Sequence, residues 1–496
     1  MTNTFKILIF SFLFIISGKL MSQENVLLDR NFWSQSPNLE TVKSKVELGN
    51  DPAEMSSNAF DPVVFAILGG ADKDIINYLL SFEGNDVNKK THDGRTYIFW
   101  SANVNDTETM EKLLKNGAKL NVTDTHGNTP LTFAAGGGQT NPAIYDLFEE
   151  YGVNIKEETN DHGANALLLA APSLKSISEL DYFVSKGLSI NSTDNEGNGI
   201  FNYAVRNGNI DFLQQLIKEE VEYKKLNDEG ANAFLFAAYG SRGHSNTLEL
   251  YEYLKGLGLD PAMVTRSGNT PLHRLASSAE PVIINFFLDN GATAAQKDGE
   301  GNTPFLNAAS RNSLEVVKLL SKSVNNLASS NAGGQNALML AVKNNSPEVV
   351  AYFLDQKINT AQIDKKGNNL AYYLFSSRSN NSVFEQKLQL LKEANVDFTA
   401  EQAEGNTIYH IVTEAGNIER LKEISGLNVD INAKNENGLT ALHIAAMKAE
   451  NDEILKLLIK EGANTTTKTA FDESVYDLAF ENELLTKNNI DLKFLK

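Results

Sequence analysis

The sequence "RSGNTPLHRLA" occupies residues 266–276, and close copies of it read "GEGNTPFLNAA" at 299–309 and "NENGLTALHIAA" at 435–446. Each copy contains a glycine, which accepts the positive φ of a tight turn at little steric cost. Two residues later Thr270 is placed to cap a helix, and Pro271 fits the first helical position because no N–H is needed there. The phrase therefore predicts a turn that leads directly into a helix.

The glycine of this phrase recurs with a period close to 33 residues. It falls at Gly94, Gly127, Gly163, Gly197, Gly230, Gly268, Gly301, Gly334, Gly367, Gly405 and Gly438, at intervals of 33, 36, 34, 33, 38, 33, 33, 33, 38 and 33 residues. Extrapolation by one period reaches Asp61 on one side and Asp472 on the other, and Asp tolerates the left-handed backbone. A period of this length indicates a stacked array, here of about 13 units.

Each unit reads as two short helices. Leu272, Leu275 and Ala276 share one helical face, and "SLEVVKLLSK" at 313–322 reads as the second helix of a unit. The Gly-Ala pair at 291–292 is typical of a helix C-terminus. One such pair cannot bury both of its faces, so neighbouring pairs must stack. At the N-terminal end "NLETVKSKVELGNDP" resembles only the back half of a unit.

The period and the phrases "GNTPLH" and "GLTALH" resemble the ankyrin repeat family over nearly the whole chain. The resemblance implies an all-α solenoid of about 13 helix-turn-helix units connected by β-turn fingers. It also implies a protein-binding function, with no cofactor. The phrase is weaker after Gly163, Gly197 and Gly367: Asn165 and Asn369 can still cap their helices there, whereas Gly199 is a poor cap that predicts local softness.

The chain divides into four predicted segments: a signal peptide (1–22), an N-terminal capping segment with a partial repeat (23–60), ankyrin repeats (61–481) and a C-terminal cap or tail (482–496). Lys6 precedes the apolar run 7–16, which is too short to span a bilayer as a helix, so we expect cleavage after Ser22. An uncleaved anchor is the alternative. We expect an exported protein, periplasmic or secreted, and the absence of cysteine excludes a lipoprotein anchor and disulfides.

Composition restricts the class of partner. The formal charge is −19, which disfavours nucleic acid and anionic membranes because both would be repelled. A cationic partner remains open, although such a charge can serve solubility alone. We expect a monomer that binds a protein or an extended peptide, with no membrane insertion once the signal peptide is removed.

The family resemblance implies that recognition uses the residues that flank each glycine and the residues that close each first helix. Carried onto this chain, these positions are His92, Asp93, Arg95, Asn103 and Val104; Arg266, Ser267, Asn269, Ser277 and Ser278; and Glu436, Asn437, Leu439, Met447 and Lys448. His126 lies on a further turn tip.

Three longer units carry extra residues between their two helices, at 136–141, 239–246 and 376–382. These inserts are either tolerated loops or a second contact rim. In the second case Tyr239, Arg242 and Arg378 are the expected anchors.

The histidines and aromatics have structural explanations. The family resemblance implies that His273, His410 and His443 bond to threonine and to turn backbone. His92, His126 and His162 lie on successive turn tips, too far apart for an unstrained metal site. The acidic turns lack the final glutamate of a calcium loop. An aromatic residue six positions beyond its glycine, as in Trp100, Tyr203, Phe236 and Tyr373, is expected in the core, with recognition as the alternative.

No catalytic motif is present, and thiol chemistry is excluded because the chain has no cysteine. The sequence predicts a non-catalytic scaffold outside the cytosol. The alternatives are a secreted effector or toxin-associated protein that binds a target of another cell and, third, an enzyme with a hidden site.

Overall fold

The structure, a computed structural model, describes residues 25–241 and 243–496. The predicted signal peptide and Arg242 lie outside this part of the chain. The described residues form two compact units: the N-terminal unit contains residues 25–174 and 178–192, and the C-terminal unit contains residues 175–177, 193–241 and 243–496. Both consist of paired short helices, and the described residues form isolated β-bridges but no longer strand.

In the N-terminal unit each pair has a first and a second helix. The first helices are α1 (Arg30–Ser34), α3 (Pro62–Leu68), α5 (Tyr97–Asn103), α7 (Pro130–Gly136) and α9 (Ala166–Ala170). The second helices are α2 (Leu39–Glu47), α4 (Lys73–Leu80), α6 (Thr107–Lys115), α8 (Pro142–Glu150) and α10 (Ile177–Ser185). First helices pack on first helices and second helices on second helices, as α5 does on α7 and α6 on α8, so each kind forms a layer.

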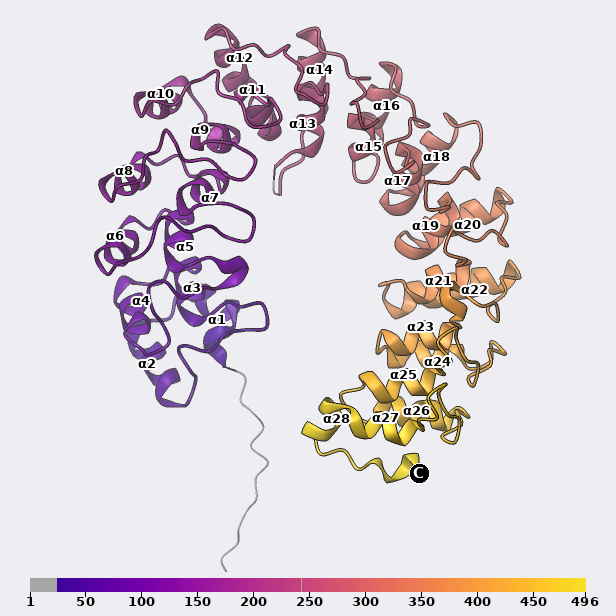
Figure 1. The fold of residues 1–496 in the computed structure, drawn as a ribbon. Helices are drawn as coiled ribbons and strands as arrows, with labels where there is room; N and C mark the ends of the chain where they lie inside the picture. The colour runs from indigo at the N-terminus through magenta and orange to yellow at the C-terminus, as the bar shows by residue number, and fades with distance from the viewer. Residues whose placement is uncertain (1–24, 242) are drawn as a thin grey trace, which may run out of the picture. The chain divides into compact units, whose positions relative to one another are not determined.

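The C-terminal unit repeats this arrangement (Figure 1). Its first helices are α11 (Ile200–Ala204), α13 (Ala233–Tyr239), α15 (Pro271–Leu275), α17 (Pro304–Arg311), α19 (Ala337–Asn344), α21 (Leu370–Phe375), α23 (Ile408–Glu414), α25 (Ala441–Lys448) and α27 (Val475–Glu481). Its second helices are α12 (Ile210–Lys218), α14 (Leu248–Gly256), α16 (Pro281–Asp289), α18 (Leu314–Ser321), α20 (Pro347–Asp355), α22 (Asn381–Glu393), α24 (Ile418–Ile424), α26 (Glu453–Lys460) and α28 (Glu483–Lys487). Short 3₁₀ helices occur in both units. They are η1 (Val26–Leu28), η2 (His92–Gly94) and η3 (Ala171–Ser173) in the N-terminal unit, and η4 (Val205–Asn207), η5 (Ala403–Gly405) and η6 (Leu492–Leu495) in the C-terminal unit.

A five-residue turn precedes the first helix of each repeat. In the turn 298–302, the Asp298 N–H donates to the Asn302 carbonyl at 3.0 Å and the Gly301 N–H donates to the Asp298 carbonyl at 2.9 Å. All eleven marker glycines have positive φ, between 68° and 92°, as predicted. The same pair of bonds closes thirteen turns among the described residues, at 56–60, 91–95, 124–128, 160–164, 194–198, 227–231, 265–269, 298–302, 331–335, 364–368, 402–406, 435–439 and 469–473.

The register extrapolated to the two ends is right at one end and wrong at the other. Asp472 has φ 66° and closes the last turn. Asp61 instead has φ −119° and caps α3, because its carboxylate accepts the Val64 N–H at 2.9 Å. The left-handed residue of this turn is Ala59, with φ 57°. The first repeat therefore begins at the turn 56–60, before the predicted boundary at residue 61.

Helix caps follow the predicted pattern. Thr270 and Thr303 accept N–H groups from the first turns of their helices, and Asn165 and Asn369 do the same where the phrase is degenerate. Gly199 provides no side-chain cap to α11, as its residue type dictates. The predicted softness of this repeat stays a prediction.

Three histidines connect each cap to the next repeat, as the family resemblance implied. Nδ1 of His443 accepts the Thr440 N–H at 3.0 Å, and its Nε2 lies 3.0 Å from the Thr467 carbonyl. His273 and His410 make the equivalent contacts. Burial lowers the pKa of all three imidazoles, although the hydrogen bonds to these carbonyls act to raise it. The fold thus uses the neutral ring, with the proton on Nε2.

The core explanation of the recurrent aromatic position is confirmed for Trp100 and Tyr373, which are buried. Each also bonds to the first residue of its own turn: the Trp100 Nε1–H donates to Thr91 at 2.8 Å and the Tyr373 hydroxyl to Asp364 at 2.6 Å. Tyr203 is half-buried and makes the same kind of bond, while Phe236 is half-buried against the core.

Both ends of the described chain carry helical caps. The segment that resembled only half a unit is preceded by α1, which packs on α3 and fills the place of a first helix, so both halves of a pair are present. At the other end α28 and η6 bury Leu485 and Leu495, so the tail contains the short helix expected there.

The third insert is shorter than predicted because α22 begins at Asn381 and takes up its last two residues. α22 also buries Lys387, whose ammonium donates to the Val342 carbonyl at 2.9 Å, in the last turn of α19. Burial lowers the pKa of Lys387 to about 8.

Candidate binding surface

The turns hold their own shape and leave their tips exposed. In the turn 298–302 the Asp298 carboxylate accepts the N–H groups of Glu300 and Asn302 at 2.9 and 2.8 Å, while the Glu300 side chain is exposed. Successive turns are joined by main chain, as where the Ala332 N–H donates to the Glu300 carbonyl at 2.8 Å. Tip side chains can therefore contact a partner without loss of these bonds.

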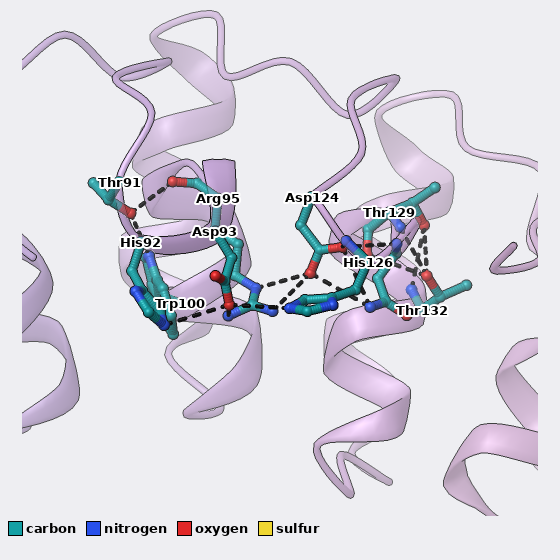
Figure 2. A network of polar contacts seen from close by, with 10 residues as sticks. Thr91, His92, Asp93, Arg95, Trp100, Asp124, His126, Thr129 and Thr132 are labelled. Atoms are coloured by element: carbon teal, nitrogen blue, oxygen red, sulfur yellow. Dashed lines mark hydrogen bonds and ion pairs between the residues drawn. The ribbon is translucent and has the colours of Figure 1, made fainter. Parts of the chain in front are cut away.

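In the N-terminal unit the predicted tip residues form a polar cluster across two turns (Figure 2). The Asp93 carboxylate lies 3.4 Å from Nε2 of His92, 3.3 Å from Nε2 of His126 and 3.1 Å from the Arg95 guanidinium. The His92 ring also stacks on Phe60 of the preceding turn, with ring centroids 4.5 Å apart. His126 is the most exposed of the cluster, so it remains available for contact.

Arg95 differs from its predicted role, because its side chain turns inward and is buried. Its guanidinium bonds to the Asp124 carboxylate at 2.8 and 2.9 Å and lies 4.3 Å from the centroid of the Phe133 ring (Figure 2 shows the ion pair). Burial opposes ionisation of Asp124, but the N–H groups of Asn128 and His126 and the guanidinium together hold its pKa below the usual range. Arg95 therefore connects one turn to the next through this ion pair, and little of its side chain is accessible to a partner.

Asn103 and Val104, at the end of α5, are half-buried. The Asn103 carbonyl accepts the Gln139 amide at 2.6 Å, so the first insert closes over this helix end. Among residues 25–241 and 243–496, no group of three His, Cys, Asp or Glu side chains is arranged to hold a metal ion.

Most of the predicted residues of the C-terminal unit are exposed, whereas Asn269, Ser277 and Leu439 are half-buried. Arg266 and Ser267 lie on the turn 265–269, and Glu436 lies on the turn 435–439. Met447 and Lys448 end α25, and Lys448 pairs with Glu414 of the neighbouring first helix. The anchors expected on the inserts, Tyr239 and Arg378, are also exposed.

Two cavities adjoin Tyr239. One, of about 310 Å³, is lined by side chains from α13, α15 and α17, including Arg274 and Arg311. The other, of about 420 Å³, lies between the end of α13 and the start of α16 and includes the apolar Leu275, Val282 and Ile283. Sequence analysis missed Arg274 and Arg311. The available signal was the density of arginine in this part of the chain.

The two units define the chain as a helical repeat protein whose exposed tips and first-helix ends form its candidate contact surface. The family description "Ankyrin repeats (3 copies)" matches residues 63–158, 98–194, 201–298, 234–329, 276–366 and 374–469. The chain belongs to the ankyrin repeat family, and its fold is all-α.

Two curated relatives are similar to parts of the chain. An ankyrin repeat protein of Acanthamoeba polyphaga mimivirus is 25% identical over 228 residues, which cover 46% of this chain and 25% of that protein. The transient receptor potential cation channel subfamily A member 1 of Homo sapiens is 24% identical over 267 residues, which cover 52% of this chain and 23% of the channel. The chain thus aligns with about a quarter of the length of each. No helix within the described residues is long and apolar enough to cross a membrane.

Proposed function

We propose that this chain is a non-catalytic scaffold that binds a protein or an extended peptide outside the cytosol. The main support for this proposal is that the turns separate two roles. Main-chain and buried polar groups form the bonds within and between turns, whereas most tip side chains face solvent. Ankyrin repeats typically bind proteins, and the resulting extended surface of tips and helix ends suits a macromolecule. Absence of enzymatic activity is part of this proposal.

The predicted signal peptide supports export. N-terminal sequencing by mass spectrometry of the protein from its native cells tests this part. We expect Gln23 as the first residue in the exported fraction; a chain that retains residues 1–22 in the cytosol would contradict it.

Affinity capture from the native envelope and the secreted fraction tests binding. The bait is the chain from Gln23, compared with a tip variant, Arg266→Ser with Glu436→Ser. A matched control, Lys218→Ser with Glu315→Ser, removes the same charges from exposed positions on second helices. We expect a partner that the control retains and the tip variant loses at least in part. Equal capture by both variants would mean that the tips are not the binding surface.

A further inference from the structure

Arginine is concentrated in one part of this acidic chain. Of nine arginines, five lie between residues 206 and 311: Arg30, Arg95, Arg206, Arg242, Arg266, Arg274, Arg311, Arg378 and Arg420 are the full set. The segment 206–311 holds ten Lys or Arg residues against thirteen Asp or Glu residues, so it is enriched in arginine although its net charge is still negative.

The arginines of the chain divide by what they contact. Arg95 and Arg420 are buried; Arg95 pairs with Asp124, and Arg420 donates to the Ser379 carbonyl at 2.7 Å. Arg274 and Arg311 are exposed, and within the described residues neither has an ion pair or a side-chain hydrogen bond. The Arg274 guanidinium lies 5.8 Å from the centroid of the Tyr239 ring, which leaves its N–H donors free.

Arg274 and Arg311 line the same cavity of about 310 Å³, with Tyr239, Ser277, Asn307 and Ser310 among its other walls. No Asp or Glu lines this cavity. Two unpaired guanidinium groups beside hydroxyl and amide groups are suited to carboxylates, which arginine binds through two parallel N–H bonds. We call the cavity the arginine niche.

Tyr239 and Arg274 also line the neighbouring cavity of about 420 Å³. Tyr239 and Val282 are exposed there at 50% and 51%, although both are large apolar side chains. This second cavity also includes Glu280, so it does not suit an acidic group. The two cavities together present a cationic site beside an apolar one, with an aromatic side chain at their junction.

We infer that the arginine niche and its apolar neighbour bind an acidic linear segment of a partner protein, in which carboxylate side chains adjoin a large apolar one. This inference rests on the proposed function and names the chemistry of the partner. Complementary charge carries it, because the niche is cationic and free of acids on a chain that otherwise repels anions. Tyrosine and arginine at such a junction are the residue types that most often anchor interfaces.

Selection from a library of random twelve-residue peptides tests the inference on the full mature chain. We expect the enriched peptides to carry two or more Asp or Glu residues next to Leu, Ile, Phe or Trp. Enrichment of basic or neutral sequences, or no enrichment, would overturn the inference.

Variants locate the site. Arg274→Ser with Arg311→Ser should weaken an enriched peptide by about tenfold or more, since each arginine supplies charge-assisted bonds. Lys218→Ser with Lys255→Ser removes the same charge from exposed positions on α12 and α14 and should leave the affinity unchanged. Equal weakening by both pairs would show that net charge, and not the niche, governs binding.

Three further outcomes keep this inference separate from the proposed function. If the enriched peptides bind the Arg274→Ser, Arg311→Ser variant as well as they bind the control variant, they bind elsewhere on the surface. The niche would then be rejected, while the proposed scaffold function would not be contradicted. Saturable binding of inorganic phosphate alone, lost in the Arg274→Ser, Arg311→Ser variant, would reassign the niche to a small anion. Failure of both the peptide selection and the envelope capture would reject the scaffold function as well.

Discussion

The difference in stability between the Lys387→Met variant and the natural chain is expected to change sign between pH 7 and pH 10. The ammonium group is buried without a carboxylate partner, and its pKa of about 8 lies below the ordinary 10.5. At 1.36 kcal/mol per pKa unit, holding the charge in the folded state at pH 7 costs on the order of 3 kcal/mol. Met removes that cost but leaves the Val342 carbonyl without its donor, which costs about 1–2 kcal/mol.

The variant should therefore be more stable than the natural chain by about 1–2 kcal/mol at pH 7. Because the folded pKa is depressed, the natural chain gains stability as the pH rises from about 8 to 10.5, where the folded state has lost its proton and the unfolded state has not. Lys387→Met lacks this gain, so near pH 10, where most of the penalty on the charge has gone, it should be the less stable of the two by up to about 1 kcal/mol.

Stability in a repeat array is distributed over neighbouring units, so the measurement should be local as well as global. Hydrogen–deuterium exchange of peptides covering α19 to α22 and urea unfolding, both at pH 7 and pH 10, give the two readouts. Lys392→Met, at an exposed position of the same helix, is the control. A stability difference that stays constant between the two pH values would refute the reasoning.

Three other perturbations have defined outcomes. Lowering the pH below about 6.5 should reduce the urea midpoint, since the buried histidines have lowered pKa values and protonation of Nδ1 turns an acceptor into a donor; His443→Gln should lessen this dependence. Gly199→Asn should add about 0.5–1 kcal/mol to the free energy of unfolding and so raise the thermal midpoint, because it adds a cap at a position with φ −90° and open space for Cβ. Arg95→Met should cost about 3 kcal/mol in urea unfolding by leaving Asp124 buried and unpaired, and adding Asp124→Asn should recover most of it.

Each of these outcomes has a control. His162→Gln changes an exposed histidine and should leave the acid dependence intact. An unaltered or lowered midpoint for Gly199→Asn would mean that α11 is limited by something other than its cap. Additive losses from Arg95→Met and Asp124→Asn would show that the two side chains are not coupled.

Local chemistry made most of the fold predictable. A glycine with positive φ, a threonine or asparagine cap and a proline at the helix start act within a few residues, so their spacing alone places the turns and helices. The error at Asp61 has the same origin: the left-handed residue there is Ala59, and alanine gives no sign of that conformation.

Side-chain direction at the surface was less predictable. Arg95 occupies a position that the family exposes, yet Asp124, 29 residues later, draws it inward. Such a contact depends on the sequence of the next repeat. Arg274 and Arg311 lie in different repeats and share a cavity only because their helices stack, so no pattern within one repeat identifies them.

The bond from Nε2 of each buried histidine ends on a main-chain carbonyl, at Asn302, Leu439 or Thr467. A carbonyl is present whatever amino acid stands at that position, so the adhesion between adjacent repeats does not read the neighbour's side chain there. Repeats joined in this way can be exchanged or duplicated, and their tip residues can change, without loss of these contacts. The tip residues can therefore evolve separately from the contacts that stabilise the stack.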